Sequence, residues 1–438
     1  MQVLINPSRE TWKEIIKRPS IDTGELNDKV QAVLDDVKAN GNRAVKKYTI
    51  DFDQVMLNHF TVTAEEMDEA ITLVSDPLKS AIQEAAANIK AFHSHQLSQP
   101  ETIETMPGIQ CWRKNVGIEK VGLYIPGGTA PLFSTLLMLG IPAVLAGCKE
   151  IVLCSPPDKE GKLNPAMLYA ATVVGVTKIF KIGGVQAIAS MAYGTETVPQ
   201  VYKIFGPGNQ YVTCAKQLVQ QQGIAIDMPA GPSEVCVWAD ETANAAFIAS
   251  DLLSQAEHGI DSQVLLVCDK ESIAQQVMEA IKTQLKVLPR EGVAFEALKN
   301  SKIIVLENAN DALDLINAYA PEHLIISCKN DEQLAEYIIN AGSVFLGNYS
   351  PESVGDYASG TNHTLPTNGF AKAYSGVSVD SFVKKITFQK LTQQGLQNIA
   401  STVIEMAEAE GLQAHANAVR LRIKPQSLMS NKVRIRNK

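Results

Sequence analysis

Four of the seven histidines lie in dense polar clusters, QAEH, EH, GDYASGTNH and EGLQAH, whose side chains could do chemistry. Gln255 and His258 are three residues apart at the end of a helical run, so one helix could offer both to a metal ion. Asp356 and a further histidine would complete a set of four ligands. Glutamine is an unusual zinc ligand, however, and scattered His and Asp side chains could equally be separate hydrogen-bonded groups. The pattern alone leaves both interpretations open.

A glutamate stands beside a histidine in the stretch YAPEHLIIS, residues 319–327. Neighbours on a regular strand point to opposite faces, so Glu322 and His323 could share a pocket only if the backbone bends at their junction. Pro321 could supply that bend, because it fixes its own φ and biases Ala320 away from the helical region. The plainer alternative is a solvated glutamate beside a buried, hydrogen-bonded histidine. Taken alone, the stretch favours the plainer alternative.

Three glycine-rich turns, YIPGG, IGGVQ and FGPGN, follow short apolar runs at residues 124–128, 182–186 and 205–209. Ligands of parallel sheets bind beyond the carboxyl ends of the strands, where such turns lie. Glycine allows a ligand to approach backbone N–H groups at the start of the next helix, which suits a pyrophosphate. None of the turns reads GxGxxG, and turn glycines are often purely structural. Nucleotide binding is therefore one of two open interpretations.

The elements that must position these residues are visible as alternating patterns. From Val121 onward, short β-branched runs such as VGLYIP and HLIISC alternate with apolar helical runs, which predicts mostly parallel sheets covered on both faces. The series repeats, so we expect an α/β fold with two successive, incomplete Rossmann-like units. A capping box at Thr63 and Glu66 opens one of several helices before them, and an amphipathic helical tail follows. The expected parts are a helical N-terminal region packing with the second unit (1–123), the first unit (124–232), the second unit (233–378) and the tail (379–438).

Composition excludes several classes of protein. A formal net charge of −8 argues against a protein that mainly grips nucleic acid. Seven cysteines without a CxxC pair fit a reducing, cytoplasmic setting better than a disulfide framework. The segment from Val121 to Cys148 carries no charge, but its prolines and glycines favour a buried β-α unit over a membrane span. No secretory signal is visible at the N-terminus, so we expect neither a membrane nor a nucleic-acid partner.

Five segments together resemble the histidinol dehydrogenase family: SQAEHGIDSQ, IDMPAGPSEV, APEHLI, GSVFLGNYSPESVGDYASGTNH and FGPGN. The likeness extends from about residue 25 to about residue 425. It implies a zinc-dependent enzyme of the last two steps of histidine biosynthesis, which oxidises L-histidinol to L-histidine with two NAD and keeps the aldehyde bound between steps. It also implies that the first α/β unit binds NAD and that the second carries the zinc and the catalytic residues.

The resemblance implies a role for each matching residue. Zn²⁺, one per subunit, would be held by Gln255, His258, Asp356 and His415. The acid/base pair would be Glu322 and His323. Together with His323 and the four zinc ligands, the substrate would contact Ser233, His363 and Glu410. NAD would be held by Tyr124, Gln186 and Asn209.

The division of labour follows from the chemistry of the implied substrate. Histidinol offers an imidazole and an amine, and zinc accepts both nitrogens, so the metal could orient the substrate. His323 would take the alcohol proton, and Glu322 would deprotonate the water that adds to the aldehyde. The family is dimeric, and the C-terminal segment of each chain reaches into the other's active site. Glu410 and His415 would then complete the partner's pocket, although their spacing fits the same chain equally well.

Two other functions are compatible with the same residues. A zinc hydrolase would use Glu322 to activate a water against a small amide or ester. A non-catalytic protein with two α/β domains would bind a small molecule without forming product.

Overall fold

The computed structural model describes residues 1–19, 24–97, 99–127, 131–176, 178–229 and 231–424. The chain forms two compact units, and each is described by itself below. The larger unit comprises Met1–Leu97 and Gly117–Phe382, and the smaller comprises Ser98–Val116 and Val383–Lys438. No helix among the described residues is long and apolar enough to cross a membrane.

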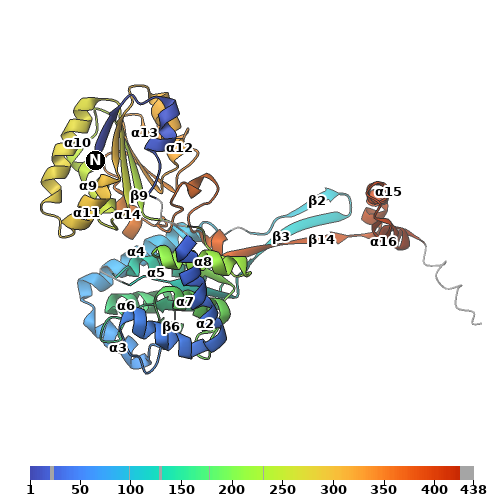
Figure 1. Ribbon diagram of the computed structural model, residues 1–438. Helices are drawn as coiled ribbons and strands as arrows, with labels where there is room; N and C mark the ends of the chain where they lie inside the picture. The colour runs from blue at the N-terminus through green and yellow to red at the C-terminus, as the bar shows by residue number, and fades with distance from the viewer. Residues whose placement is uncertain (20–23, 98, 128–130, 177, 230, 425–438) are drawn as a thin grey trace, which may run out of the picture. The chain divides into compact units, whose positions relative to one another are not determined.

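The first lobe of the larger unit is built on a five-stranded sheet in the order β6-β5-β4-β7-β8, with every neighbouring pair parallel (Figure 1). Its strands are β4 (Lys120–Tyr124), β5 (Glu150–Ser155), β6 (Lys178–Lys181), β7 (Lys203–Phe205) and β8 (Ala225–Ile226). The helices after them are α5 (Phe133–Leu145), α6 (Pro165–Val174), α7 (Gly184–Tyr193) and α8 (Gln210–Gln221). The charge-free segment forms β4 and α5, which confirms the buried β-α interpretation.

The N-terminal helices pack on this first lobe, whereas we expected region 1–123 to pack with the second unit. They are α2 (Gly24–Tyr48), α3 (Ala64–Leu73) and α4 (Asp76–Ser94). The apolar face of α2, including Leu34 and Val37, packs with α7 and α8, while α3 and α4 pack with α6 and α5. An amphipathic pattern shows which face of a helix is buried but not which sheet buries it. The capping box of Thr63 and Glu66 at the start of α3 is confirmed.

The second lobe is built on a six-stranded parallel sheet in the order β1-β11-β10-β9-β12-β13. Its strands are β1 (Gln2–Ile5), β9 (Glu234–Ala239), β10 (Gln263–Cys268), β11 (Lys302–Val305), β12 (His323–Ser327) and β13 (Ser343–Leu346). Its helices are α1 (Trp12–Ile15), α9 (Ala245–Ala256), α10 (Glu271–Leu285), α11 (Glu291–Lys299), α12 (Ala309–Tyr319), α13 (Asp331–Ala335) and α14 (Glu352–Tyr357).

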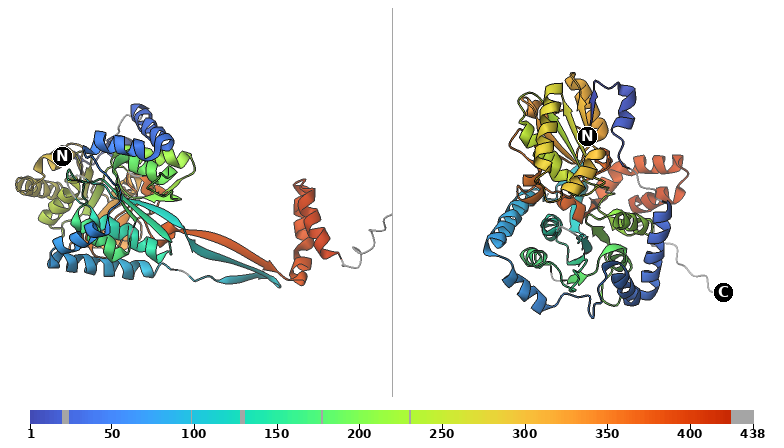
Figure 2. Two further views of the ribbon diagram at one scale, coloured as in Figure 1. Left: turned by 90° about the horizontal axis from the view of Figure 1, so that it is seen from below. Right: turned by 60° about the vertical axis from the view of Figure 1, so that its left-hand side comes forward.

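Helices cover both faces of this second sheet (Figures 1 and 2). Along β9, Val235 and Val237 pack with α9, α10 and α11, while the alternate residues Cys236 and Trp238 pack with α1 and α12. Because both faces of the sheet are buried, successive residues of each strand are apolar, and the strands read as continuous apolar runs. The two α/β units expected from the sequence are therefore present. The first residues of the chain do join the second unit, as expected of region 1–123, but as strand β1 and not as a helix.

The smaller unit contains a three-stranded sheet in the order β14-β3-β2 and a pair of helices. Its elements are β2 (Thr102–Met106), β3 (Ile109–Gly117), β14 (Val383–Leu391), α15 (Gln393–Ala409) and α16 (Gln413–Ile423). We expected the tail from residue 379 to be helical, and this is wrong for its first part. Phe388 of β14 stacks on Trp112 of β3 with ring centroids 5.4 Å apart, which pairs the tail with an earlier hairpin. Residues 425–438 of the predicted tail lie outside the described residues.

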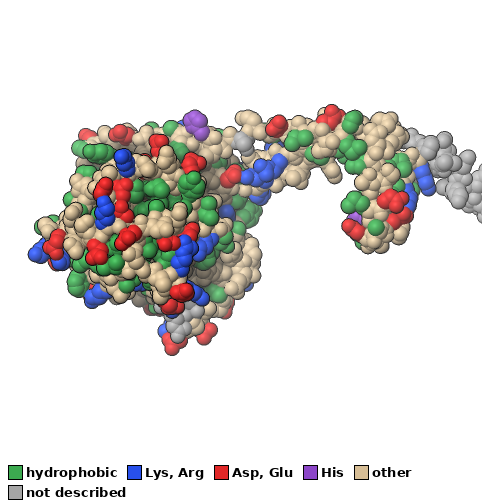
Figure 3. Space-filling model, turned by 90° about the horizontal axis from the view of Figure 1, so that it is seen from above, with side chains coloured by type: hydrophobic (Ala, Val, Ile, Leu, Met, Phe, Trp, Pro, Cys, Tyr) green, Lys and Arg blue, Asp and Glu red, His purple; other side chains and the backbone are tan. Residues whose placement is uncertain are grey.

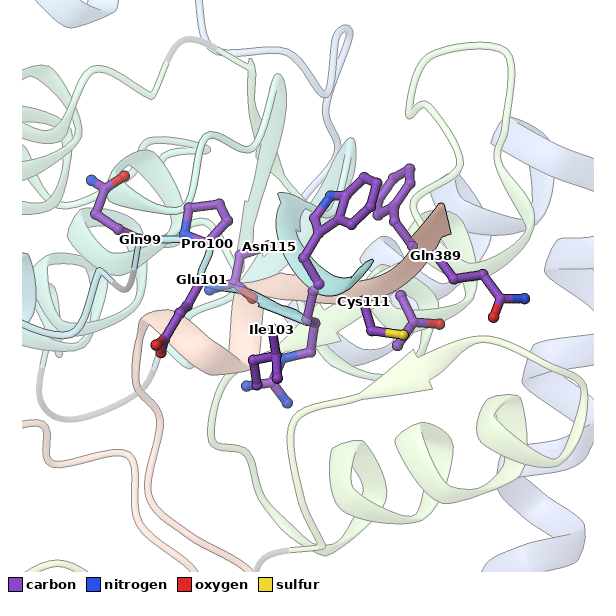
Figure 4. A pocket seen from close by; sticks show the side chains of 11 residues that line it. Gln99, Pro100, Glu101, Ile103, Cys111, Asn115 and Gln389 are labelled. Atoms are coloured by element: carbon purple, nitrogen blue, oxygen red, sulfur yellow. The ribbon is translucent and has the colours of Figure 1, made fainter. Parts of the chain in front are cut away.

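A groove of about 780 Å³ runs along this small sheet (Figure 4). Its lining includes Ile103, Cys111 and Trp112 from the hairpin and Phe388 and Gln389 from β14.

Candidate active site

The Glu322–His323 pair lies at the amino end of β12, where the backbone bends. Helix α12 ends at Tyr319, its C-cap Ala320 has a left-handed φ of 52°, and the strand begins only at His323. A non-glycine residue pays about 1 kcal/mol for that conformation, so the bend is held by its surroundings. As a result Glu322 stands outside the strand, and its Oε2 lies 3.7 Å from His323 Nδ1. The two side chains are therefore buried side by side, as the bent-backbone interpretation required.

Burial and charge shift the protonation of this pair. Burial raises the pKa of Glu322 to about 8, and the neighbouring His323 only partly offsets the effect. Desolvation by itself lowers the pKa of His323, but the carboxylates of Glu322, Asp356 and Glu352 outweigh it and raise the pKa to about 10. The two groups thus hold protons that ordinary Glu and His side chains would release at neutral pH, which is a common property of acid/base sites.

The His323 ring is fixed by contacts at both nitrogens. Nδ1 lies 3.1 Å from the carbonyl oxygen of Glu234, and because a carbonyl only accepts, Nδ1 carries the proton and donates. Nε2 lies 3.2 Å from Asp356 Oδ1. The backbone N–H of Glu234 donates to Glu322 Oε2 at 2.9 Å, so this one residue holds both members of the pair.

Three of the four predicted metal ligands lie in the larger unit. The buried Gln255 has its Nε2 3.2 Å from His323 Nδ1, while its Oε1 is buried without a hydrogen-bond partner. Desolvation lowers the pKa of His258 despite the charge of Asp356, although the residue as a whole is exposed. Burial by itself raises the pKa of Asp356, but the hydrogen bond from His323 and nearby histidines lower it overall. The set therefore offers a free amide oxygen, a neutral imidazole and an ionised carboxylate.

No group of three or more His, Cys, Asp or Glu side chains is arranged to hold a metal within the described part of the chain. The predicted set supplies only His258 and Asp356 of these types from the larger unit, with a glutamine as its third member. The fourth, His415, lies in α16 of the smaller unit, and Glu410 directly follows α15. Both of these residues are exposed, and their roles stay predictions.

The other two predicted substrate contacts also lie near the pair. His363 has Nδ1 2.7 Å from the carbonyl oxygen of Asp356 and Nε2 3.0 Å from Thr135 Oγ1 of α5. That second contact joins the site of the second lobe to the first lobe. Ser233 directly precedes β9 and is partly buried, beside the Glu234 backbone that holds Glu322.

The three predicted NAD contacts lie at the carboxyl ends of the first-lobe strands. Tyr124 ends β4, and its hydroxyl accepts from Gly184 N at the start of α7 at 3.1 Å. Gln186 donates from Nε2 to Asp53 Oδ2 at 3.2 Å, and its Oε1 is buried without a partner. Asn209 caps α8, accepting at Oδ1 from the N–H groups of Tyr211 and Val212. Its amide nitrogen remains for a ligand.

Glycine is required in the FGPGN turn. Gly206 has φ of 125°, and a Cβ there would lie 1.9 Å from the carbonyl oxygen of Tyr124. Its N–H and carbonyl are bound by Asp227 and Lys216, which form an ion pair at 2.5 Å. The FGPGN turn is therefore held rigidly at the end of β7. Gly128 of the YIPGG turn lies outside the described residues.

Sequence reasoning missed three acidic residues of these sites, namely Glu234, Glu352 and Asp53. Glu352 carried a usable signal, because it lies four residues before Asp356 and shares a helix face with it. Glu234 follows Ser233 in a strand-like run. It contacts Glu322 and His323 through its backbone, and a residue type does not reveal contacts of that kind. Asp53 lies in a region that we expected to carry little chemistry.

Comparisons of the sequence and of the structure with known proteins identify the same family. The model of the family described as histidinol dehydrogenase matches residues 16–423. A histidinol dehydrogenase from Bacteroides thetaiotaomicron is 59% identical over 423 residues, covering 97% of this chain and 99% of that protein. One from Vibrio cholerae serotype O1 is 51% identical over 419 residues, covering 95% and 96%. The crystal structure of histidinol dehydrogenase from Elizabethkingia anophelis has a TM-score of 0.95 at 55% identity, covering 98% of this chain and 99% of that one.

Proposed function

Because this chain belongs to the histidinol dehydrogenase family, we propose that it oxidises L-histidinol through bound L-histidinaldehyde to L-histidine. These are the last two steps of histidine biosynthesis. The observation that carries the proposal is the family match over residues 16–423. The buried Glu322–His323 pair supports it, because oxidation of an alcohol to a carboxylate needs a group that accepts protons in each step.

The overall reaction removes two hydrides and three protons from one histidinol and one water. NAD, when bound, accepts the hydride of each oxidation. His323 takes the alcohol proton in the first oxidation and the hydroxyl proton of the hydrated aldehyde in the second. Glu322 takes a proton from the water that adds to the aldehyde. Because Asp356 raises the pKa of His323, a cation bound to Asp356 would lower that pKa toward the working range of a base.

The residues present fit a divalent cation, and we assign Zn²⁺, one per subunit, to Gln255, His258, Asp356 and His415. The unpartnered Oε1 of Gln255 is a buried acceptor that lacks a donor, as expected for a ligand atom. Gln255 and His258 also lie at the C-terminal end of α9, where the helix dipole favours a cation. When bound, zinc supplies a template that orients the imidazole and amine nitrogens of the substrate. Ser233, His363 and Glu410 would contact the substrate as well.

The first lobe suits a dinucleotide, which we assign to Tyr124, Gln186 and Asn209. The N-termini of α7 and α8 lie beside these residues, and helix N-termini favour the negative charge of a pyrophosphate. The free Oε1 of Gln186 calls for a donor, such as a ribose hydroxyl or the nicotinamide carboxamide. On this assignment the first lobe is the NAD-binding domain and the second is the zinc and catalytic domain.

The smaller unit supports a homodimer in which Glu410 and His415 complete the partner's site. Its helices bury few side chains, chiefly Ala400, Ala407 and Ala416, while Ile103 is 58% exposed and Met406 is 60% exposed. Figure 3 shows hydrophobic side chains on the surface of this unit. Apolar surface of that kind is typical of a protein interface. We place the enzyme in the cytoplasm, with a small-molecule substrate and neither a nucleic-acid nor a membrane partner.

A stoichiometric assay tests the proposal. Purified protein is incubated with histidinol and NAD, with and without a metal chelator, and NADH is counted per histidine formed. We expect two NADH per histidine and loss of turnover with chelator. A hydrolase would form no NADH, and a binding protein would form no product, so either result would reject the proposed function.

A further inference from the structure

An arginine near the N-terminus contacts Glu234, the residue whose backbone holds the Glu322–His323 pair, and none of the roles above uses it. The side chain of Arg18 is 14% exposed and that of Glu234 is 3% exposed. Arg18 Nε donates to Glu234 Oε1, and Arg18 Nη2 donates to Oε2 at 2.7 Å. The backbone N–H of Asn368 also donates to Oε1 at 2.8 Å. A two-point ion pair of this kind fixes direction as well as distance.

The same guanidinium reaches the chain segment that leads to Glu322. Arg18 Nη2 donates to the carbonyl oxygen of Tyr319 at 2.8 Å and to that of Ala320 at 3.4 Å. The guanidinium carbon lies 4.1 Å from the centre of the Tyr319 ring, which adds a cation–π contact. Ala320 is the residue whose left-handed φ produces the bend before Glu322. Arg18 therefore ties this bend to Glu234 at the start of β9.

His323 has a position that does not depend on Arg18 alone. It is the first residue of β12 and is paired in register with Val235 of β9 and Ser343 of β13, so the strand ladders fix its backbone. Its ring contacts the carbonyl oxygen of Glu234 at one nitrogen and Asp356 at the other.

Glu322 precedes the strand and has fewer supports. On the side of β13, its carbonyl oxygen accepts from Ser343 N at 2.9 Å. On the side of β9, its carboxylate accepts from Glu234 N at 2.9 Å. That second bond forms only if the bend and the start of β9 keep their separation, which is the distance that Arg18 spans. The carboxylate of Glu322 therefore depends on Arg18 more than the His323 ring does.

We propose that Arg18 is a positioning residue, which sets the place of the Glu322 carboxylate by tying Glu234 to the bend at Ala320. The inference rests on the proposed function, in which Glu322 takes a proton from the water that adds to the aldehyde. The attraction between two buried charges is largely offset by the cost of removing them from water, so stability by itself explains the ion pair poorly. In this role Arg18 touches neither substrate nor cofactor.

The two half-reactions test this role, measured by stopped-flow NADH formation from histidinol and from histidinaldehyde on the full-length protein. Arg18→Met removes the guanidinium and keeps an apolar stem beside Tyr319. A displacement of about 1 Å can lower a rate about 10²-fold, so aldehyde oxidation should fall by about that factor. Alcohol oxidation should fall much less, because His323 keeps its other supports. The affinities for zinc and for NAD should not change.

A double-mutant cycle shows whether the loss runs through Glu322. In the Glu322→Gln background no carboxylate is left to position, so Arg18→Met should lower aldehyde oxidation by less than about 3-fold. Arg18→Lys keeps a charge beside Glu234 without the two-point geometry and should lower aldehyde oxidation about 10-fold in the unsubstituted background. The same cycle with Arg18→Lys decides the question if Arg18→Met does not fold.

Arg9→Met is the matched control. Arg9 lies in the same N-terminal segment, forms an ion pair with Asp311 of α12 and contacts the ring of Trp12, but its side chain is exposed. It binds the same helix without reaching the bend or β9. Arg9→Met should therefore change neither half-reaction.

Each outcome bears on the inference. Equal losses in the two half-reactions, or equal losses in the two backgrounds, would show that Arg18 supports the fold as a whole and would overturn the positioning role. Failure of both Arg18 variants to fold would overturn it for the same reason. Unchanged aldehyde oxidation in both variants, while Glu322→Gln lowers it, would overturn the role and leave the proposed function standing. If the unsubstituted protein formed no NADH from histidinol, the proposed function and this inference would fall together.

Discussion

The two lobes share one architecture, but their candidate site residues lie at opposite ends of the parallel strands. In the first lobe the candidate NAD residues lie at the carboxyl ends of the strands, beside the N-termini of α7 and α8. In the second lobe Glu322 and His323 lie at the amino end of β12, and Gln255 lies at the C-terminus of α9. The helix ends therefore present positive dipoles to a predicted pyrophosphate and a negative dipole to a predicted cation. The rule that ligands bind beyond the carboxyl ends of parallel strands describes only the first lobe.

Each candidate site contains a buried glutamine whose side-chain oxygen has no hydrogen-bond partner. Gln186 donates to Asp53, and Gln255 Nε2 lies 3.2 Å from His323 Nδ1, while the Oε1 atom of each glutamine has no hydrogen-bond partner. On the proposed assignment, each free amide oxygen would face a chemically different ligand, NAD in the first lobe and zinc in the second. If the first lobe binds NAD and the second binds zinc as proposed, substitutions in one site should leave the affinity for the other site's ligand unchanged.

The largest effect is expected from Glu322→Gln in the second lobe. The amide cannot take a proton from water, so aldehyde oxidation should fall by about 10²- to 10⁴-fold, the usual contribution of a general base. Alcohol oxidation should fall much less, because His323 serves that step. Stopped-flow NADH formation from histidinol and from histidinaldehyde measures the two separately. Glu332→Gln, an exposed carboxyl on α13, is the control, and equal losses in both half-reactions would contradict the assigned role.

His258→Ala should come next and should act on zinc alone. Zinc affinity should fall by more than about 100-fold, since even groups that only orient ligands contribute 10- to 100-fold. Chelator competition and metal analysis of the dimer measure this loss, with the exposed His59→Ala as control. NAD affinity, measured calorimetrically, should stay within error of the unchanged protein. A parallel loss of NAD binding would break the division between the lobes.

Gln186→Ala should produce a smaller effect on the other ligand. One hydrogen bond contributes about 1 to 1.5 kcal/mol, so the Kd for NAD should rise about 10-fold. Zinc affinity should not change. Calorimetric titration with NAD tests this, and Gln220→Ala, an exposed glutamine on α8, controls for loss of an amide in the same lobe. An unaltered Kd would remove Gln186 from the NAD site.

The last prediction concerns the stability of the fold rather than a ligand, and it involves Asp251, the carboxylate within the helix that carries Gln255. Burial raises the pKa of Asp251 to about 7, whereas the pKa of Asp356 is lowered. A carboxyl whose folded pKa lies above its unfolded pKa stabilises the fold below the unfolded value, and this contribution is lost as pH rises through about 7. Asp251→Asn should therefore raise the free energy of unfolding on the order of 2 kcal/mol at pH 8 and less at pH 5.

Urea unfolding of both proteins at the two pH values measures the difference. If Asp251→Asn raised the free energy of unfolding equally at pH 8 and pH 5, ionisation of Asp251 would not destabilise the native protein, and the prediction would be wrong.

Much of the fold could be predicted because buried parallel strands carry continuous apolar runs. Most strands of both lobes fall where runs such as HLIISC and EIVLCSPP predict them, whereas β1 and the two-residue β8 were not predicted. The strands β2, β3 and β14 were missed because they are largely exposed and lack that pattern. The packing of α2, α3 and α4 on the first lobe was missed because it depends on contacts that no local pattern specifies.

The site divides in the same way. Residue types with unusual chemistry, such as the adjacent Glu322 and His323, could be found in the sequence. Groups that act through their backbone could not be found, and Glu234, whose N–H donates to Glu322, is of this kind. Such residues become visible only when the partners that they hold have been placed in space.

The hydrogen bond between His363 and Thr135 links the two lobes directly. One ring nitrogen is fixed on the backbone of Asp356, and the other touches the first turn of the helix that leaves β4. A molecule that shifts this helix must change the energy of the imidazole contact, and thermodynamic reciprocity requires the reverse. The amide of the neighbouring Asn362 also donates to the carbonyl oxygen of Met138 in the same helix at 2.6 Å, so a shift of α5 would strain two adjacent contacts rather than one.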